Sequence, residues 1–578
     1  MALQERADCP KNYELIDSWL SKCKSHRLCA KSAEFLDDLK LPTRLIDVGE
    51  AGDGSDAKLV ETSNIADHAS IRYVALTHCW GDPNRIPKTT QNTIDDHYIK
   101  LPELSKTFRD AVKVVKQLNI HYIWIDSLCI IQDVKADFHK ECALMHHVYA
   151  GAYLTISALG AESGDIGLFI PRSLHKAKPV LFWDTALCGP LMSRGWALQE
   201  QQLSPRLIHF AQERIIWECR TTVAFEDQPY MTHRSTAALS WAIGSSGGAP
   251  DRYMSWRIFD RSDGSNALKS FQTVHAKRDD VFTRWLRLVE GYSERKFTYA
   301  DDKQFALQGI SSAISRMTDS TLVSGLWCKD LFRGLLWTPA PMVQKRFTEE
   351  SASFSFQKLP LAPSWSWLSH DGPVRFRGAV ADRFAEFFTS RTNDWLGSKP
   401  PHIKLGSSAS AAKLDGDIQY PILHINALCT RIFASGSQVT LQHPSRPSTK
   451  LDARTAIIKT LQATDAGSSG GKQNTSELRT IEIKTGPYVY RSFPYDAVLY
   501  LERGFGDSES IFEGLICLLS VTSVPSKDEI SLMTEPGLVL KPVQDGRYER
   551  VGLCQICVAY SPHEKALAVL ERLAVEVI

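Results

Sequence analysis

The stretch that decides the fold of the first half of the chain is residues 73–81, which read YVALTHCWG. Its first five residues are uniformly apolar or β-branched, as is typical of a strand buried on both faces. Residues 105–118 then carry apolar side chains at helical spacing, and 122–126 (YIWID) form a second buried strand pattern. This order predicts a β-α-β unit with parallel strands.

The same alternation continues along the chain. Apolar residues at helical spacing predict a second helix over 137–149, and 153–158 (YLTISA) has the pattern of a third strand. Residues 207–210 and 214–219 predict a hairpin that closes the unit. We therefore expect an α/β domain over 71–225, with a parallel sheet covered by helices.

The remaining chain predicts three further regions. Residues 1–70 form a polar lead-in that we expect to pack on the α/β domain, and 226–345 have a mainly helical pattern. Residues 346–578 alternate short β-rich runs with Gly, Ser and Pro clusters, for example at 464–474. This last part predicts an α+β, partly β-rich region with flexible loops.

Composition excludes several classes of function. The 578 residues hold 67 Lys and Arg against 66 Asp and Glu, so a net charge of +1 gives no field to attract nucleic acid. No apolar run is long enough to span a membrane, and the N-terminus lacks the pattern of a secretory signal. The 13 cysteines lie mostly within apolar segments, which is typical of buried thiols in a reducing compartment. We expect a cytoplasmic protein with no structural disulfides, no membrane span and no nucleic-acid partner.

Candidate ligand-binding residues follow the predicted strands. Ligands of open parallel sheets bind outside the carboxyl ends of the strands, where His78 and Trp80 follow the first strand and Asp126 ends the second. An acid at that position can equally cap a helix N-terminus. Cys79 beside His78 suggests a thiol nucleophile with its base, but adjacent residues of an extended segment point to opposite sides.

The strongest candidate for catalysis is Glu200, four residues after Trp196. A helix carries such a pair on one face, so the carboxylate would lie beside an aromatic wall that tunes its pKa. It could then hold a ribose hydroxyl or stabilise a developing oxocarbenium charge. The structural alternative is that Arg194 pairs with Glu200 while Trp196 fills the core.

The lead-in contains the ligand types of a zinc site. Cys23, His26 and Cys29 are spaced at three-residue intervals, with Cys9 upstream. The spacing differs from the usual paired arrangement, and the same residues would form a stripe on one helix face. The pattern favours packing, and we predict no metal site.

Three ordered motifs resemble the fungal heterokaryon-incompatibility (HET) domain. They are 73–81 (YVALTHCWG, with Thr77 where Ser is usual), 122–133 (YIWIDSLCIIQD) and 194–200 (RGWALQE). Trp19 with the cysteine and histidine spacing of the lead-in, the helix at Asp302 and residues 363–367 (PSWSW) resemble longer members of that family. The resemblance implies a role in nonself recognition and regulated cell death, with this domain as the effector.

The HET domain is in turn remotely similar to Toll/interleukin receptor (TIR) domains. The resemblance implies a TIR-like, flavodoxin-like fold, self-association, and NAD+ as a substrate rather than a cofactor. Glu200 matches the glutamate that serves NAD+ hydrolysis in enzymatic TIR domains, although one extra residue, Gly195, separates Ser193 from Trp196. His78, Trp80, Asp126 and Trp196 would then line the substrate pocket. A non-enzymatic, self-associating signalling module is the alternative.

Overall fold

The computed structural model describes the following residues: 3–30, 39–50, 56–68, 71–94, 98–172, 187–233, 281–300, 302–339, 362–376, 402–405, 412–414, 418–420, 422–435, 438–453, 455–461, 478–484, 496–501, 512–518, 521–525, 530–534, 537–555, 557–558 and 571–578. The Gly/Ser cluster at 464–474 lies outside them.

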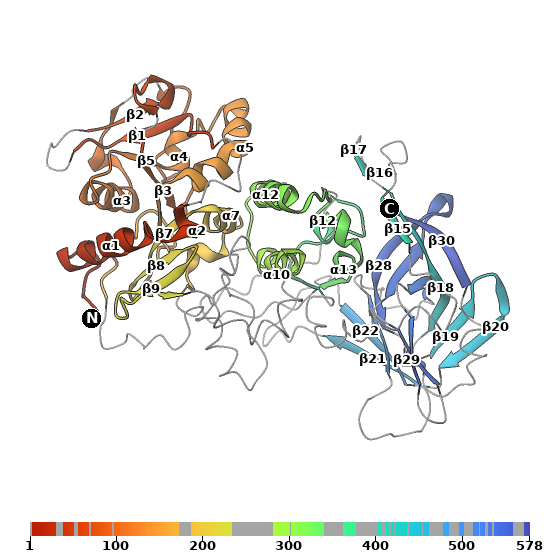
Figure 1. Cartoon of the computed structure of the whole chain (residues 1–578). Helices are drawn as coiled ribbons and strands as arrows, with labels where there is room; N and C mark the ends of the chain where they lie inside the picture. The colour runs from red at the N-terminus through yellow and green to blue at the C-terminus, as the bar shows by residue number, and fades with distance from the viewer. Residues whose placement is uncertain are drawn as a thin grey trace, which may run out of the picture. The chain divides into compact units, whose positions relative to one another are not determined.

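The chain divides into two compact units, whose elements are drawn in Figure 1. The first unit comprises residues 1–277 and 295–319, and the second comprises 278–294 and 320–578. The helical segment after residue 280 therefore contributes to both units.

A ten-stranded sheet forms the centre of the first unit, in the order β10-β9-β8-β7-β6-β3-β5-β1-β2-β4. Its central strands β7, β6, β3 and β5 are mutually parallel, as the alternating pattern predicts. They span Arg206–Phe210, Leu154–Ser157, Tyr73–Thr77 and Tyr122–Trp124. Every residue of β3 and β6 is buried, which explains their uninterrupted apolar character.

Helices connect the parallel strands. α3 (Lys106–Gln117) begins after Ser105, whose side chain accepts a hydrogen bond from the backbone N–H of Phe108. α4 (Asp126–Cys129) and α5 (Lys135–Gly151) lead from β5 to β6, and α7 (Trp196–Leu203) precedes β7. The predicted β-α-β unit and both predicted helices are confirmed.

The flanking strands are antiparallel, so the sheet is parallel only at its centre. β1 (Arg44–Asp47) pairs with β5, and β2 (Ala57–Glu61) and β4 (Tyr98–Ile99) extend that edge. The predicted hairpin is confirmed by β7 and β8 (Ile215–Cys219), beyond which lie β9 (Thr222–Phe225) and β10 (Thr232–His233). In α1 (Pro10–Cys23), the indole of Trp19 donates to the carbonyl of Pro229 over 3.0 Å, and its ring centroid lies 6.2 Å from that of Trp217 in β8.

Two later helices complete the first unit. α11 (Asp302–Phe305) and α12 (Gln308–Thr318) follow residue 295, and α12 packs on α5 and α7. The backbone N–H of Gly309 donates to the Gln199 side chain over 2.9 Å, which fixes α12 against α7.

The second unit contains a tryptophan-rich core. Gly325 has φ of +80°, and its carbonyl accepts hydrogen bonds from the indoles of Trp285 (3.4 Å) and Trp367 (3.0 Å). A Cβ at Gly325 would lie 2.6 Å from Trp367 Nε1, so only glycine fits. The motif 363–367 therefore serves packing. The elements around it are α10 (Val281–Ser293), β11 (Leu322–Val323), β12 (Leu326–Trp327), α13 (Leu331–Gly334), β13 (Trp337–Pro339) and β14 (Val374–Phe376).

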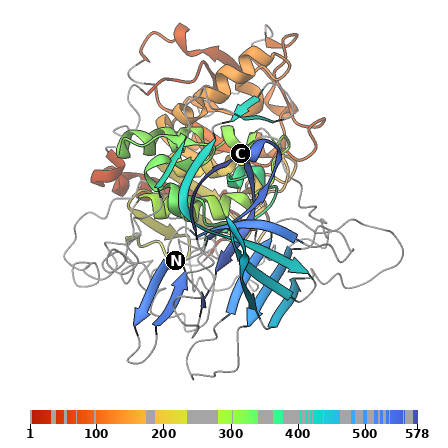
Figure 2. The ribbon, with the colours of Figure 1, turned by 90° about the vertical axis from the view of Figure 1, so that its right-hand side faces the viewer.

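The rest of the second unit is β-rich, as predicted, and its strands lie side by side in Figure 2. An eleven-stranded sheet follows the path β20-β19-β18-β24-β27-β28-β23-β22-β21, with β15 and β30 paired to β18. These strands are β15 (His402–Leu405), β18 (Leu423–Ser435), β19 (Gln438–His443), β20 (Arg446–Ala453), β21 (Thr455–Leu461), β22 (Leu478–Lys484), β23 (Asp496–Leu501), β24 (Phe512–Leu518), β27 (Gly537–Pro542), β28 (Tyr548–Gln555) and β30 (Glu571–Val577). Two smaller sheets contain β16 (Ala412–Leu414) with β17 (Ile418–Tyr420), and β25 (Val521–Pro525) with β26 (Ile530–Thr534) and β29 (Cys557–Val558).

Within the described parts of both units, none of the helices combines the length and apolar character that crossing a bilayer requires.

Candidate functional site

Two of the predicted site residues meet at the carboxyl ends of the parallel strands. His78 directly follows β3 and Asp126 begins α4 just after β5, with 3.9 Å between His78 Nδ1 and Asp126 Oδ1. The indole N–H of Trp80 donates to Asp126 Oδ2 over 2.8 Å. Asp126 Oδ1 also accepts from the backbone N–H of Ser127 over 2.8 Å. Asp126 therefore occupies a helix start and at the same time fixes Trp80.

Glu200 reaches the same region from α7. Its side chain is 1% exposed, and its Oε2 has no hydrogen-bond partner. Burial raises the pKa of this carboxyl from 4.5 to about 7, the Asp126 carboxylate adds to the rise, and the Arg194 guanidinium opposes it. The hydroxyls of Thr77 and Tyr149 also oppose the rise. Glu200 thus carries a pKa in the range where a carboxyl group exchanges protons at neutral pH.

Arg194 holds the N-terminal approach to α7 against β3. Its guanidinium donates to the backbone carbonyl of His78. Among the described residues Arg194 and Glu200 form no ion pair within 4.0 Å, but their opposite charges still interact, as the structural alternative supposes. Burial disfavours the Arg194 charge, but the carboxylates of Glu200 and Asp126 outweigh burial and raise its pKa. We call His78, Trp80, Asp126, Arg194 and Glu200 the strand-end cluster.

His78 is neutral at physiological pH. It is 1% exposed, and neither ring nitrogen has a hydrogen-bond partner. Burial lowers the pKa of its imidazole to about 4, against the opposing effect of Asp126. Burial likewise raises the pKa of the neighbouring Cys79 thiol to about 11, which disfavours a thiolate nucleophile here.

Trp196 lies apart from these contacts. It is the first residue of α7, and its indole N–H donates to Asp302 Oδ2 of α11 over 3.1 Å. Just before it, the N–H of Gly195 donates to the carbonyl of Lys296 over 2.9 Å. The structure therefore brings His78, Trp80, Asp126 and Glu200 together and commits the Trp196 indole to a different partner.

Tyr149 is a neighbour that the sequence analysis missed. It is fully buried in α5, and its hydroxyl donates to the carbonyl of Leu76 over 3.1 Å beside Glu200. Its place on the apolar face of the predicted helix suggested packing alone. α5 leads into β6, and β6 pairs with β3. This pairing places Tyr149 near the end of β3 and therefore beside the strand-end cluster.

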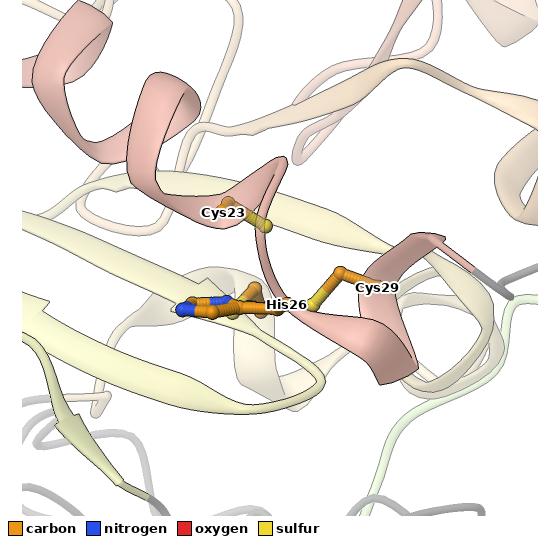
Figure 3. A group of neighbouring side chains, drawn as sticks. Cys23, His26 and Cys29 are labelled. Carbon is orange, nitrogen blue, oxygen red and sulfur yellow. Dashed lines mark hydrogen bonds between the residues drawn. The ribbon is translucent and has the colours of Figure 1, made fainter.

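A second group of side chains lies at the end of α1 (Figure 3). Cys23 ends α1, His26 lies in the following turn and Cys29 belongs to the short helix α2 (Arg27–Ala30). Cys219, the last residue of β8, joins them, and one potential ligand atom from each of the four residues lies within 4.8 Å of the others. The chain turns after Cys23, so the expected stripe along one continuous helix face is wrong. Cys9 precedes the first turn of the 14-residue α1 and lies at its other end, about 20 Å away.

Part of the first unit matches a known protein family. Residues 73–185 match the family model described as "Heterokaryon incompatibility protein (HET)". "Heterokaryon incompatibility protein 6, OR allele" of Neurospora crassa is 27% identical over 103 residues, which is 16% of this chain and 15% of that relative. The chain thus matches only about 15% of the length of this curated relative. No solved structure matches the chain at a significant level.

Residues 73–185 therefore match a heterokaryon-incompatibility domain, as the motifs in this range indicate. His78, Trp80 and Asp126 lie within the matched range, whereas Arg194, Glu200 and Cys219 lie beyond it.

Proposed function

We propose that this chain is an effector of heterokaryon incompatibility that promotes regulated cell death after nonself recognition. Two findings support this proposal: the HET family match over 73–185 and the similarity to a protein named for heterokaryon incompatibility. Such an effector could act in either of two ways: by catalysing a reaction or by binding other proteins.

We propose NAD+ hydrolysis at the strand-end cluster as that mechanism. Numbered along the chain, the parallel strands β5-β3-β6-β7 have the order 2-1-3-4, which supports a flavodoxin-like arrangement. In such sheets ligands bind at the carboxyl ends of the strands, where the cluster lies. The observation that carries the proposal is Glu200, a buried carboxyl group with an unpartnered oxygen and a pKa near neutrality.

In NAD+ hydrolysis the main contribution of the protein would be electrostatic stabilisation of the transition state. The bond between nicotinamide and ribose breaks with its electron pair going to nicotinamide, which leaves an oxocarbenium-like ribose. Water then adds to that carbon and releases a proton, giving ADP-ribose and nicotinamide. The Glu200 carboxylate would accept hydrogen bonds from ribose hydroxyls and stabilise the cationic transition state. Trp80, held by Asp126, would provide an aromatic surface for the substrate.

Access to Glu200 requires a movement, because the carboxyl group is 1% exposed. The chain around Lys296 holds the N-terminal end of α7 through a backbone β-bridge with Arg194, and Asp302 accepts a hydrogen bond from the indole of Trp196. We propose that self-association displaces this segment, which opens the site and frees Trp196 to contact substrate. A catalytic site that is closed at rest suits an effector whose activity is lethal.

The burial of Glu200 also favours a second candidate function, a non-enzymatic module that signals by self-association. In that case the cluster serves only to position α7 and the ends of β3 and β5. The two candidates differ in whether NAD+ is consumed.

Expression in fungal cells separates them. Wild-type protein is expected to arrest growth and deplete NAD+, while Glu200→Gln does neither at equal protein level. Glu141→Gln is the matched control, because Glu141 is also 1% exposed and has a burial-raised pKa, but lies on α5 near Arg44. Full toxicity of Glu200→Gln without NAD+ loss would rule out the hydrolase and support the second candidate.

A further inference from the structure

We propose that Cys23, His26, Cys29 and Cys219 form a tetrahedral Zn²⁺ site that joins the N-terminal lead-in to the central sheet. The proposal is independent of NAD+ hydrolysis. It rests on the convergence of four residues of zinc-binding type from three elements, one of them about 190 residues distant in sequence.

The backbone directs the first three ligands toward one point. α1 ends at Cys23, and the N–H of His26 donates to the Cys23 carbonyl over 3.0 Å. The N–H of Cys29 then donates to the His26 carbonyl over 3.1 Å. These two successive turns break the helix after Cys23, and Figure 3 shows the three side chains near one another at this break.

The interatomic distances match those of a metal site. His26 Nδ1 lies 3.8 Å from Cys29 Sγ and 3.6 Å from Cys219 Sγ. Zn–S bonds of about 2.3 Å and Zn–N bonds of about 2.0 Å in a tetrahedron separate nitrogen from sulfur by about 3.5 Å. All four ligand atoms lie within 4.8 Å of one another, so little adjustment is needed to admit the ion.

Further donors surround the sulfur atoms. The backbone N–H of Thr222 donates to Cys219 Sγ over 3.2 Å, and the Thr222 hydroxyl lies 3.2 Å from the same sulfur. The hydroxyl of Thr221 lies 3.5 Å from Cys29 Sγ. Hydrogen bonds to a thiolate stabilise its charge and fix its direction, as outer-shell groups do around metal ligands.

The composition of the site favours zinc in a structural role. Three thiolates and one imidazole form a closed Cys3His set, which leaves no open position for a substrate. Cys23, Cys29 and Cys219 are all buried, and none of the ten described cysteines forms a disulfide.

The position of the site gives it a consequence for the domain. Glu218, next to Cys219 in β8, accepts a hydrogen bond from Gln201 of α7 over 3.1 Å. The metal would therefore fasten α1 and α2 to the strand that also contacts the helix carrying Glu200. Loss of the metal should loosen both the lead-in and α7.

Elemental analysis of the full chain, purified without added metal under reducing conditions, tests the proposal. We expect about one zinc per chain in the wild type and less than a tenth of that in Cys219→Ser. Cys188→Ser, which changes an exposed cysteine of the same unit, is the control and should retain the full content. Wild-type protein that is folded and fully reduced but contains no zinc, and gains none when zinc is added, would overturn the proposal.

A ligand exchange keeps the test decisive if Cys219→Ser fails to fold. His26→Cys should still bind metal, now through four thiolates, whereas His26→Ala should bind it at least about tenfold more weakly. In cobalt-substituted protein the thiolate-to-cobalt charge-transfer absorption should be stronger for His26→Cys than for the wild type. Equal cobalt spectra for these two proteins would show that His26 is not a ligand and would contradict the proposed set.

Discussion

Glu200 and Glu226 are both buried carboxyl groups of the first unit, at 1% and 0% exposure, but their surroundings differ. Glu226 accepts hydrogen bonds through both oxygens from Arg172 at 2.8 and 2.6 Å. It also accepts from three further donors: the Gln4 N–H (3.1 Å), the Asn12 amide (3.2 Å) and the Ile215 N–H (2.9 Å).

Glu200 has no comparable set of donors. Arg194, the cation nearest to it in sequence, donates to a backbone carbonyl instead, and Glu200 Oε2 is unpartnered. Glu226 ties the N-terminal residues to β8, as a structural carboxylate should. Glu200 bears the cost of burial without such compensation. Glu141 does so too, because neither of its carboxyl oxygens has a hydrogen-bond partner, so the position of Glu200 at the ends of the parallel strands is what suits a functional group. The comparison distinguishes the two roles where burial alone does not.

The largest predicted effect concerns Glu226. Glu226→Gln should lower the free energy of unfolding by about 3–5 kcal/mol, because it leaves the buried guanidinium of Arg172 without its counter-ion. Glu200→Gln should cause no such loss at pH 7, because no close ion pair is broken and the neutral amide avoids the burial of a charge. Urea titrations of both variants measure the difference, and equal losses would remove the distinction between the two carboxylates.

The next effect is the pH dependence of stability. The folded-state pKa of Glu200 is raised from 4.5 to about 7, so the folded protein binds the proton more tightly than the unfolded chain. The contribution of Glu200 to the free energy of unfolding is therefore greatest below pH 4.5. It falls by about 3 kcal/mol as the pH rises to 7. Glu200→Gln should lack this contribution, so its advantage over the wild type should grow across the interval. Parallel stability curves for the two proteins would contradict the raised pKa.

A smaller effect is expected at Trp80. Trp80→Phe removes the indole N–H that fixes Asp126 and should cost about 1 kcal/mol, since the indole is only half-buried. The matched variant Trp196→Phe removes the hydrogen bond to Asp302 and should cost a similar amount. Thermal unfolding measures both, and a loss in either variant as large as that of Glu226→Gln would contradict these magnitudes.

The sequence predicts the centre of the fold well because that part depends on local patterns. Buried parallel strands such as 73–77 are uninterrupted apolar runs, and Ser105 is a recognisable helix N-cap. β1 pairs with β5 in the antiparallel direction at the edge of the parallel strands. The sequence does not predict this pairing, because the partner of a strand depends on the tertiary arrangement.

The candidate site was predictable only in part for the same reason. The rule that ligands bind at strand ends indicates His78 and Asp126, and the structure places them 3.9 Å apart. The contact of Arg194 with the His78 carbonyl and the approach of Cys219 to His26 each join distant segments. No local pattern encodes such contacts, so the sequence alone does not identify the hydrogen-bond partner of Arg194 or bring Cys219 to the N-terminal cysteines.

The central claim is that Glu200 is a catalytic carboxylate whereas Glu226 is a structural one. The most direct measurement is nicotinamide release from NAD+ by purified, self-associated full-length protein, followed by chromatography. We predict steady release by the wild type, and a loss of at least about a hundredfold in Glu200→Gln that folds normally. Release by Glu200→Gln at the wild-type rate, or no release by assembled wild-type protein, would contradict the claim.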